Sequence, residues 1–430
     1  MLFYLLMVLG LNLIILIHEL GHYLVAKQFG IKTEIFAVGL GRTLYSKQLD
    51  STLFRINLIP LGGYVSLKTQ LGNDDDDNYL NASWSTKCLI LLAGPMVNAC
   101  VGIALLFLSF QIGVTVFEPV IQQTTFNSPL HQAGIRSNDR ITQVNGKQIS
   151  TLNQLVSQLI IHIGDDQPVV LTTQASTEHS VDLSNIALSG PNKNLMSALG
   201  INNPAYTKQI SSVIADSPAA EAGLQPGDTI VRINNQPLFT WDEILSVIQA
   251  SPNQTLTIEL TRDEATRVYS VSVADNHSQG FIGITPMINE SMFSLEQLNF
   301  ADSAFKSIEE SLDYIYFNSI VISKLITGQL PISIFMGPIG IINLFYNNFN
   351  EFSGDLLYLI GMLNIALFYF NMLPIPCLDG SLILLATIER LVGRKKFSIR
   401  FQNLLLEIGT IAIIFLAIQI AIYDLAALLS

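Results

Sequence analysis

The segment Leu2–Ala26, LFYLLMVLGLNLIILIHELGHYLVA, decides the architecture of this chain. It is apolar and long enough to cross a bilayer as a helix, for which about 20 residues suffice. It nevertheless contains His18, Glu19 and His22, and ionisable side chains inside a membrane are costly and usually functional. On a helix the two histidines lie one turn apart on the same face, so both imidazoles can bind one metal ion. The segment therefore predicts a membrane helix that carries part of a metal site.

The five residues His18-Glu19-Leu20-Gly21-His22 also have the HExxH spacing, in which two histidines bind Zn²⁺ and the glutamate acts on water at the metal. Glu19 would point to the side of the two rings, within reach of that water. The same short pattern occurs by chance in unrelated proteins. The alternative interpretation is a set of polar residues whose hydrogen bonds are satisfied inside a helix bundle.

The composition of the whole chain is that of a membrane protein. Half of its 430 residues are hydrophobic and only 13% are charged, which is too apolar for an ordinary soluble enzyme. The first segment has no basic stretch ahead of it and holds polar residues in its apolar core, so we do not expect a cleaved signal peptide. Apolar stretches near spanning length occur at Leu2–Ala26, Cys88–Val116, Leu356–Ile388 and Phe401–Leu425. We expect an α-helical polytopic membrane protein with four transmembrane helices, within residues 1–26, 88–116, 351–389 and 401–430.

The positions of Lys and Arg predict how these spans are oriented. The turn in residues 390–400 holds five of them, and the loop in residues 27–87 holds seven. Because loops rich in Lys and Arg stay in the cytoplasm, both should be cytoplasmic. The two termini and the long segment in residues 117–350 then lie on the opposite side.

The net charge of the chain bears on its partners, and the positions of its cysteines bear on disulfide bonds. The net charge of −12 argues against nucleic acid as a partner. The three cysteines, Cys88, Cys100 and Cys377, lie in or beside the predicted spans, so we expect no disulfide in the exported segment and interpret them as buried apolar residues.

An internal repeat occupies the exported segment. Ser128-Pro129, Ala133-Gly134-Ile135, Asp139 and Asn145 recur 89 residues later as Ser217-Pro218, Ala222-Gly223-Leu224, Asp228 and Asn234. Each copy predicts a short helix, a turn, a β-strand and a second helix. The copies resemble PDZ domains, whose signature is nearly complete in Ala222–Asn234, whereas the first copy has Asn138 in place of Gly227. We expect two tandem α+β PDZ domains, in residues 117–204 and 205–288.

In the circularly permuted PDZ form that these copies resemble, the peptide-binding loop comes last. The candidates are Leu199, Gly200 and Ile201 in the first copy and Ile282, Gly283 and Ile284 in the second. The edge strand of such a domain can bind an extended peptide as an additional strand. The alternative is that the two copies act as a rigid spacer or a size filter, and the sequence identifies no peptide ligand.

Residues 289–350 predict an amphipathic helical segment on the outer side. Within Ser303–Thr327, apolar residues recur among acidic and small polar ones at Ile308, Leu312, Ile315, Ile322 and Leu325. A helix of this kind can lie at a membrane surface. The stretch Met336-Gly337-Pro338-Ile339-Gly340 then leads towards the third span.

A tetrahedral Zn²⁺ held by two imidazoles needs a third protein ligand and one open position. Asp379 is the acid that the third span offers, after the helix-breaking Pro374 and Pro376. The first basic residue follows 9 positions after His18 and 11 after Asp379. At about 1.5 Å per residue, both groups lie roughly 14–17 Å from the same membrane boundary, so they can meet at one level. Cys377 is an alternative contact for the metal.

The motifs in the first and third spans and the repeat pair between the second and third are more specific together than any one of them alone. HELGH in the first span, Asn371-x-x-Pro374-x-x-x-Leu378-Asp379-Gly380 in the third and a PDZ pair between spans two and three resemble the site-2 protease family of intramembrane metalloproteases, in its Gram-negative branch. The motifs FAVGLG at 36–41, PLGGYV at 60–65 and AGPMVN at 93–98 are also similar to that family. The resemblance implies Zn²⁺ bound by His18, His22 and Asp379, Glu19 as general acid and base, and Asn371 holding substrate near the metal.

Two further elements could contact substrate. Arg55–Leu67 alternates loosely around Pro60 and Gly62-Gly63, which predicts a β-hairpin that dips into the membrane, with Gly62, Gly63 and Tyr64 beside the metal; a surface hairpin is the alternative. Asn98 in the second span is either a substrate-contacting amide or a hydrogen bond between helices.

The family resemblance also implies an activity and a location. The substrates would be single-span membrane proteins, such as an anti-sigma factor, already trimmed outside the membrane, and possible remnant signal peptides. The protein would then be a multi-pass protein of the bacterial inner membrane, in contact with lipid, with its PDZ domains and both termini in the periplasm. The alternative functions are a zinc transporter or sensor, and an inactive scaffold that presents PDZ domains.

Overall fold

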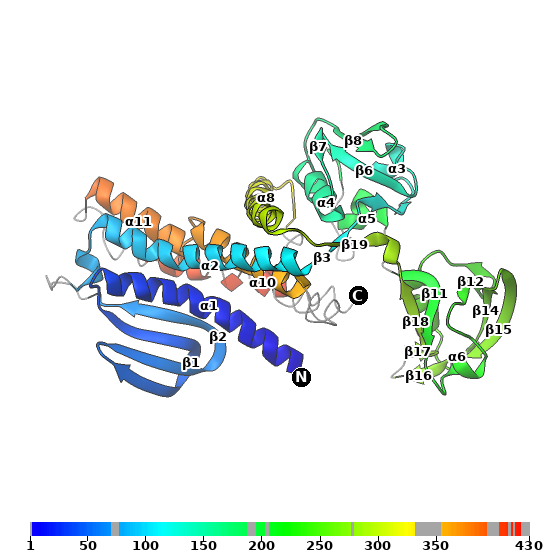
Figure 1. Ribbon diagram of the computed structural model, residues 1–430, viewed down its shortest axis with the longest axis horizontal. Coiled ribbons are helices and arrows are strands. Elements are labelled where there is room, and N and C mark those ends of the chain that lie inside the picture. Colours follow the sequence, from blue (N-terminus) through cyan, green and yellow to red (C-terminus); the bar gives the residue numbers. More distant parts are fainter. Residues whose placement is uncertain are drawn as a thin grey trace. The chain divides into compact units, whose positions relative to one another are not determined.

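The structure is a computed structural model that describes residues 2–69, 77–186, 195–202, 206–276, 279–331, 354–393, 404–411, 414–415 and 418–422. The chain divides into two compact units (Figure 1). Residues 1–115, 189–192 and 295–430 form one, which we call the helical unit, and residues 116–188 and 193–294 form the other, the β-rich unit. The Met336–Gly340 motif and the basic residues Arg394–Arg400 lie outside the described residues.

The helical unit is organised around α2. Its helices are α1 (Leu2–Gln28), α2 (Trp84–Ile112), α8 (Phe300–Ile326), α10 (Gly354–Met372) and α11 (Asp379–Val392), with the 3₁₀ turn η1 (Tyr79–Asn81) before α2. Residues 404–411, 414–415 and 418–422 are also helical. The helix α2 packs against α1, α8, α10 and α11. Of the described helices, α2 and α10 are long and apolar enough to cross a membrane.

The helix α2 begins and ends earlier than the apolar run in residues 88–116 predicts. Its first turn is capped by Ser83, whose hydroxyl accepts a hydrogen bond from the Thr86 backbone, so the helix starts among polar residues. It ends at Gly113, whose φ of 115° is accessible to glycine and strained for other residues. The helix is therefore displaced by four residues from the predicted span.

Glycines set the distance between α2 and α10. A Cβ at Gly102 would lie 2.8 Å from Ile365 Cδ1 and 3.0 Å from the Gly361 carbonyl oxygen, and one at Gly361 would lie 3.0 Å from Leu106 Cγ. The first distance is too short for a real Cβ atom, and the other two are shorter than most Cβ contacts. The two backbones therefore approach closely, as small residues allow in membrane helix pairs.

The predicted break in the third span is present and splits it into two helices. The helix α10 ends at Met372 and α11 begins at Asp379, with Pro374 and Pro376 between them. Cys377 in this link has φ of 83°, and its Sγ lies 2.6 Å from Thr410 Oγ1. A contact between Cys377 and the predicted metal ligands is not among its described interactions.

The sheet after α1 differs from the predicted hairpin. It consists of β1 (Thr33–Leu49) and β2 (Thr52–Leu67), joined by a tight turn at Asp50, whose φ is 50°. Residues 33–38 of β1 pair on one side with residues 63–67 of β2 and on the other with residues 53–56. The two arms of the predicted hairpin, on either side of Pro60 and Gly62, therefore do not pair with each other. Residues of β1 lie between them and pair with both.

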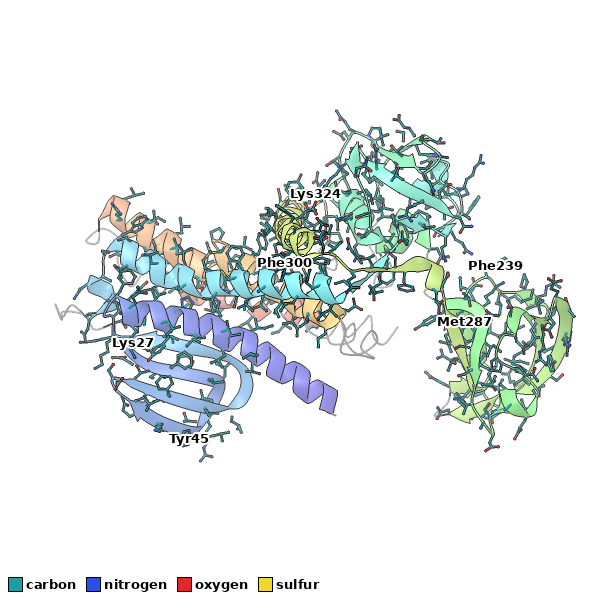
Figure 2. All side chains as sticks on the ribbon, in the orientation of Figure 1. Lys27, Tyr45, Phe239, Met287, Phe300 and Lys324 are labelled. Carbon is teal, nitrogen blue, oxygen red and sulfur yellow. The ribbon has the colours of Figure 1, made fainter. Side chains whose placement is uncertain are left out.

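Apolar side chains on this sheet are unusually exposed. Leu44, Tyr45, Ile56 and Leu58 are each more than half exposed, and Figure 2 shows Tyr45 projecting away from the helices of this unit. Contiguous exposed apolar surface marks an interaction site or a membrane contact.

The helix α8 is amphipathic, with its small polar residues turned inward. Figure 1 shows α8 almost end-on, so it crosses the direction of α2. Ser303, Ser307 and Ser311 are buried, whereas Phe305 and Leu312 are 75% and 60% exposed. Small residues at helix contacts and apolar residues facing outward are typical of helices that contact lipid.

The β-rich unit contains the two repeats. The first comprises β4 (Val120–Ile121), β5 (Gln123–Thr124), α3 (Pro129–Gln132), β6 (Asp139–Val144), β7 (Lys147–Gln148), α4 (Leu152–Ile161), β8 (Val169–Thr173), β9 (Glu178–Val181), α5 (Leu195–Leu199) and β10 (Ile201–Asn202). The second comprises β11 (Tyr206–Val213), α6 (Pro218–Glu221), β12 (Thr229–Ile233), β13 (Gln236–Pro237), α7 (Trp241–Gln249), β14 (Thr255–Arg262), β15 (Ala265–Ser272), β16 (Ala274–Asn276), β17 (Gln279–Phe281) and β18 (Ile284–Ile288). β3 (Val114–Phe117), η2 (Glu290–Met292) and β19 (Phe293–Glu296) lie where the chain passes between units.

The two copies share backbone geometry even where their residues differ. Asn138 and Gly227 have φ of 69° and 94°, and asparagine is among the few residues that tolerate this left-handed region. The departure from the repeat pattern at Asn138 is therefore structurally conservative.

The second copy carries an ion pair for which the first copy has no arginine at the equivalent position. Arg262 donates to both oxygens of the fully buried Asp228, at 2.5 and 2.7 Å, and to the Gly223 carbonyl oxygen at 2.9 Å. Arg262 corresponds at the repeat offset to Thr173 in the first copy.

Replacing Arg262 with Ala should lower the free energy of unfolding of the second copy by about 3–5 kcal/mol, because a buried carboxylate is left uncompensated. The matched control is Arg232→Ala, which removes an exposed pair with Glu259 at 3.4 Å and should cost at most about 1 kcal/mol. Thermal unfolding of the two variants measures the difference. Equal destabilisation by both substitutions would contradict the assignment.

Candidate metal centre

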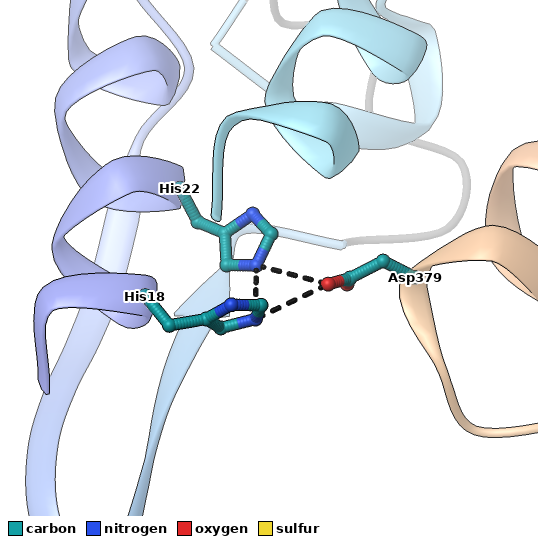
Figure 3. A group of neighbouring side chains, drawn as sticks. All are labelled: His18, His22 and Asp379. Atoms are coloured by element: carbon teal, nitrogen blue, oxygen red, sulfur yellow. Dashed lines mark hydrogen bonds and ion pairs between the residues drawn. The ribbon is translucent and has the colours of Figure 1, made fainter. Parts of the chain in front are cut away.

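The structure brings His18, His22 and Asp379 together (Figure 3). The two histidines come from one face of α1, and Asp379 is the first residue of α11. Asp379 Oδ2 lies 3.2 Å from His18 Nε2 and 3.4 Å from His22 Nε2, and the two Nε2 atoms are 3.1 Å apart. Both histidines are less than 9% exposed. Residues more than 350 positions apart in the sequence thus share one buried site.

The contacts of His22 decide which of its ring nitrogens faces the cluster with a lone pair. Its Nδ1 lies 2.7 Å from the Ile90 carbonyl oxygen, which can only accept, so in the neutral ring, the form that binds metal, Nδ1 carries the proton and Nε2 the lone pair. Asp379 Oδ2 is itself buried and has no hydrogen-bond partner among the described residues. With the ring neutral, two atoms that both carry lone pairs, and that can both only accept a hydrogen bond, therefore face each other at 3.4 Å.

This arrangement fits a metal ion. A tetrahedral Zn²⁺ with Zn–N and Zn–O bonds near 2.0–2.1 Å separates its ligand atoms by about 3.3 Å. The three observed separations are 3.1, 3.2 and 3.4 Å. A cation between these atoms would also give Asp379 Oδ2 a partner. Buried polar groups need a partner, because leaving them unpaired is costly. Two imidazoles and one carboxylate are a donor set suited to zinc, with a fourth position left open.

The helix α2 fits around the ring of His22 because residue 94 is glycine. A Cβ at Gly94 would clash with the His22 ring, 2.7 Å from Cε1 and closer still to Nε2. On the other side, a Cβ at Gly21 would lie 2.7 Å from the Ala93 carbonyl oxygen. Gly21 and Gly94 therefore allow α1 and α2 to approach each other closely at the level of His18, His22 and Asp379.

Glu19 lies between the cluster and the sheet. Its carboxylate interacts electrostatically with His22, His18 and Asp379 and accepts a hydrogen bond from the Val65 backbone in β2. A Cβ at Gly63 would lie 3.6 Å from Glu19 Cγ. Gly63 is therefore next to the glutamate, as predicted for this strand, and its neighbours Gly62 and Tyr64 lie on the same edge segment.

The remaining candidate residues differ in whether they contact the cluster formed by His18, His22 and Asp379. Asn98 is fully buried and contacts His18, whereas the Asn371 amide donates to the Leu367 carbonyl of its own helix at 3.0 Å. Gly200 and Gly283, in the loops predicted to bind peptide, have φ of 95° and 83°. Gly283 is followed by the edge strand β18, and Gly200 by β10, which pairs with β5. These loops belong to the β-rich unit and are not part of the cluster.

Sequence reasoning named Asn98 in α2 as a candidate but missed the contributions of Ile90 and Gly94. Ile90, Gly94 and Asn98 recur every four residues on one face of α2, and each contacts His22 or His18. The AGPMVN motif holds Gly94 and Asn98 at the spacing of one helical turn, which is the signal that could have paired this helix with α1.

Comparison with known proteins gives a consistent result over the whole chain. Residues 6–416 match the model of peptidase family M50. The regulator of sigma-E protease RseP of Salmonella typhimurium is 28% identical over 430 residues, 95% of each protein. RseP of Escherichia coli is 27% identical over 431 residues, again 95% of each. A protein of Vibrio cholerae with a zinc metalloprotease name is 29% identical over 440 residues, 97% of this chain and 96% of that one.

Among solved structures, the PDZ domain of an SdrC-like protein of Listeria monocytogenes matches 20% of this chain and 93% of its own length. The identity is 22% and the TM-score is 0.18.

Replacing Gly94 with Ala should lower the zinc content of the purified protein well below one ion per chain, because the added methyl group displaces the His22 ring. The control is Gly10→Ala in α1, where an added Cβ meets no atom within 4 Å. Metal analysis by mass spectrometry measures both. Full zinc occupancy in Gly94→Ala would contradict the packing described here.

Proposed function

This chain belongs to peptidase family M50 and is a zinc metalloprotease of the site-2 type, and from that premise we propose that it cleaves peptide bonds within the membrane-spanning segments of single-span proteins. We propose that His18, His22 and Asp379 bind the zinc ion and that Glu19 is the catalytic acid and base. The observation that carries this proposal is the convergence of the three ligand atoms within 3.4 Å, beside a glutamate that no ligand role requires. A transporter needs no such glutamate.

The residues divide the chemistry between them. Bound to the three ligands, Zn²⁺ supplies Lewis acidity, which polarises a carbonyl group and lowers the pKa of water towards about 7. Glu19 takes the proton of the attacking water and passes it to the leaving amine nitrogen. The Val65 backbone hydrogen bond holds the Glu19 carboxylate in place beside the three ligands. The packing of α2 against the rings limits the access of water from that side.

The edge of β2 is suited to hold the substrate in an extended form. Within the described structure, residues 63–67 have a strand partner on one side, residues 33–38, and Gly63 lies next to Glu19. A peptide added to the open edge would make backbone hydrogen bonds in place of its helical ones. Such unwinding matters because a peptide bond in a helix has its carbonyl group already hydrogen-bonded.

We propose that the protein is a multi-pass protein of the bacterial inner membrane, with four spans and with both termini in the periplasm. The apolar α2 and α10, the exposed apolar residues of the β1–β2 sheet and the basic loops at 27–87 and 390–400 support this arrangement. The helix α8, in which Ser303 accepts a hydrogen bond from Gln111 of α2 at 2.7 Å, would then lie at the periplasmic surface of the inner membrane with Phe305 and Leu312 in lipid.

We propose that the β-rich unit is a pair of PDZ domains in the periplasm, which limits cleavage to substrates trimmed beforehand. The names of the relatives as regulators of sigma-E support an anti-sigma factor as substrate. The edge strand β18 after Gly283 supports peptide binding by the second copy, and the bulk of the two copies supports a size filter.

Replacing Glu19 with Gln should leave about one zinc ion per chain and reduce cleavage of a single-span substrate by about 10²–10⁴-fold, because the general base is lost while the ligands remain. Glu34→Gln, on the exposed start of β1, is the control and should retain activity. Zinc analysis and a cleavage assay with purified substrate give the two measurements. An active Glu19→Gln protein would exclude the proposed role of Glu19.

His18→Ala and Asp379→Ala should each lose bound zinc and cleavage together, because two ligands hold zinc far more weakly than three. His162→Ala is the control, since His162 pairs with Asp165 in the β-rich unit. A chelator should likewise abolish cleavage by the wild type, and added Zn²⁺ should restore it. Retention of zinc by the Asp379 variant would show that the third ligand is misassigned.

Replacing residues 117–293 with a short flexible linker should permit cleavage of a substrate that still carries its folded periplasmic domain. Cleavage of pre-trimmed substrate by the same variant is the control for an intact site. If the variant cuts trimmed substrate and still refuses the untrimmed one, the β-rich unit is not the filter.

A further inference from the structure

Asn98 in α2 is a polar residue that is fully buried next to His18 of the proposed metal site. Its Nδ2 lies 3.2 Å from His18 Nδ1, the ring nitrogen that points away from Asp379. Its Oδ1 is buried and has no hydrogen-bond partner among the described residues. A buried amide oxygen without a donor is costly, so this contact needs an explanation.

The two ends of an amide side chain have nearly the same shape, and their assignment follows from the hydrogen bonds they can make. If Asn98 Nδ2 donates to His18 Nδ1, the proton of the neutral ring must sit on Nε2, and that nitrogen has no lone pair for a metal. If the amide is turned, Oδ1 accepts a hydrogen bond from Nδ1–H and His18 Nε2 presents its lone pair to the cluster. The turned amide also gives the orphaned oxygen a donor.

The second histidine shows the same pattern with no ambiguity. The Ile90 carbonyl oxygen, two turns earlier in α2, accepts from His22 Nδ1 at 2.7 Å. Metal-binding histidines generally donate their other ring N–H to a carbonyl or carboxylate, which fixes the tautomer and the ring orientation. A backbone oxygen does this for His22, and Asn98 is the side chain placed to do it for His18.

We infer that Asn98 is a positioning residue, whose amide oxygen accepts a hydrogen bond from His18 Nδ1 and so directs the Nε2 lone pair to the metal. The inference rests on the proposed role of His18 as a zinc ligand. Of the two roles expected of Asn98 from the sequence, it agrees with the hydrogen bond between helices and replaces the contact with substrate. The side chain has no exposed surface for a substrate, and the group it contacts across the helix pair is the ligand itself.

The test compares the zinc dissociation constants of full-length variants in detergent, by competition with a chelating dye. Asn98→Leu has nearly the shape of asparagine without an acceptor and should weaken zinc binding about 10–100-fold. Asn98→Asp keeps an oxygen next to Nδ1 and should stay within about threefold of the wild type. Asn98→Ala, measured beside them, should behave as Asn98→Leu does and shows that bulk is not the cause.

Asn364→Ala provides a matched control. Asn364 in α10 is 1% exposed, and its Oδ1 also has no hydrogen-bond partner among the described residues, but its amide donates to the Ile360 carbonyl of its own helix at 2.8 Å. Its loss should leave the zinc dissociation constant unchanged, which separates a specific effect on His18 from a general loss of stability.

The outcomes distinguish the inference from the function on which it rests. Wild-type zinc affinity in Asn98→Leu, or equal weakening in Asn98→Leu and Asn98→Asp, would overturn the positioning role while His18→Ala still loses zinc. If His18→Ala keeps its zinc, the proposed ligand set is wrong, and that result does not depend on Asn98.

Discussion

The close approach of His18 Nε2, His22 Nε2 and Asp379 Oδ2 inside an apolar bundle is the interaction on which the rest of this structure depends. Atoms that offer lone pairs repel one another when they are buried within 3.4 Å, and a cation between them turns repulsion into ligation. The helices that carry these atoms must therefore be held by other contacts. The packing of α1, α2 and α11 supplies those contacts.

The helix α2 is the element that provides most of this support. One of its faces, with Ile90, Gly94 and Asn98, receives the two histidine rings. Another face, with Gly102 and Leu106, receives α10 at short range. At its start, Trp84 donates to Thr387 Oγ1 in α11 at 3.1 Å and stacks on Arg390. The helix that contributes no proposed metal ligand thus positions both helices that do.

The sequence predicts the fold well where local residue patterns decide the structure, and poorly where contacts between distant segments decide it. The Pro374–Pro376 break, the repeat at an offset of 89 and the amphipathic α8 are present as expected. The pairing of β1 with both arms of β2 was not predictable, because strand partners are chosen by packing between segments and not by local pattern. The burial of three serines in α8 was not predicted either, because which small residues lie at a helix contact depends on the helix that packs there.

By itself the sequence determined the chemistry available to this protein: HExxH within an apolar segment, an acid after a proline break in another apolar segment, and two tandem repeats. These features are legible because burying His, Glu or Asp in a membrane helix carries a large free-energy cost that few roles justify. The tertiary structure alone decided how the site is assembled. Whether a ring nitrogen offers a proton or a lone pair depends on the atom opposite it, and the atoms opposite His22 and His18 belong to Ile90 and Asn98, about 70 and 80 residues away in the sequence.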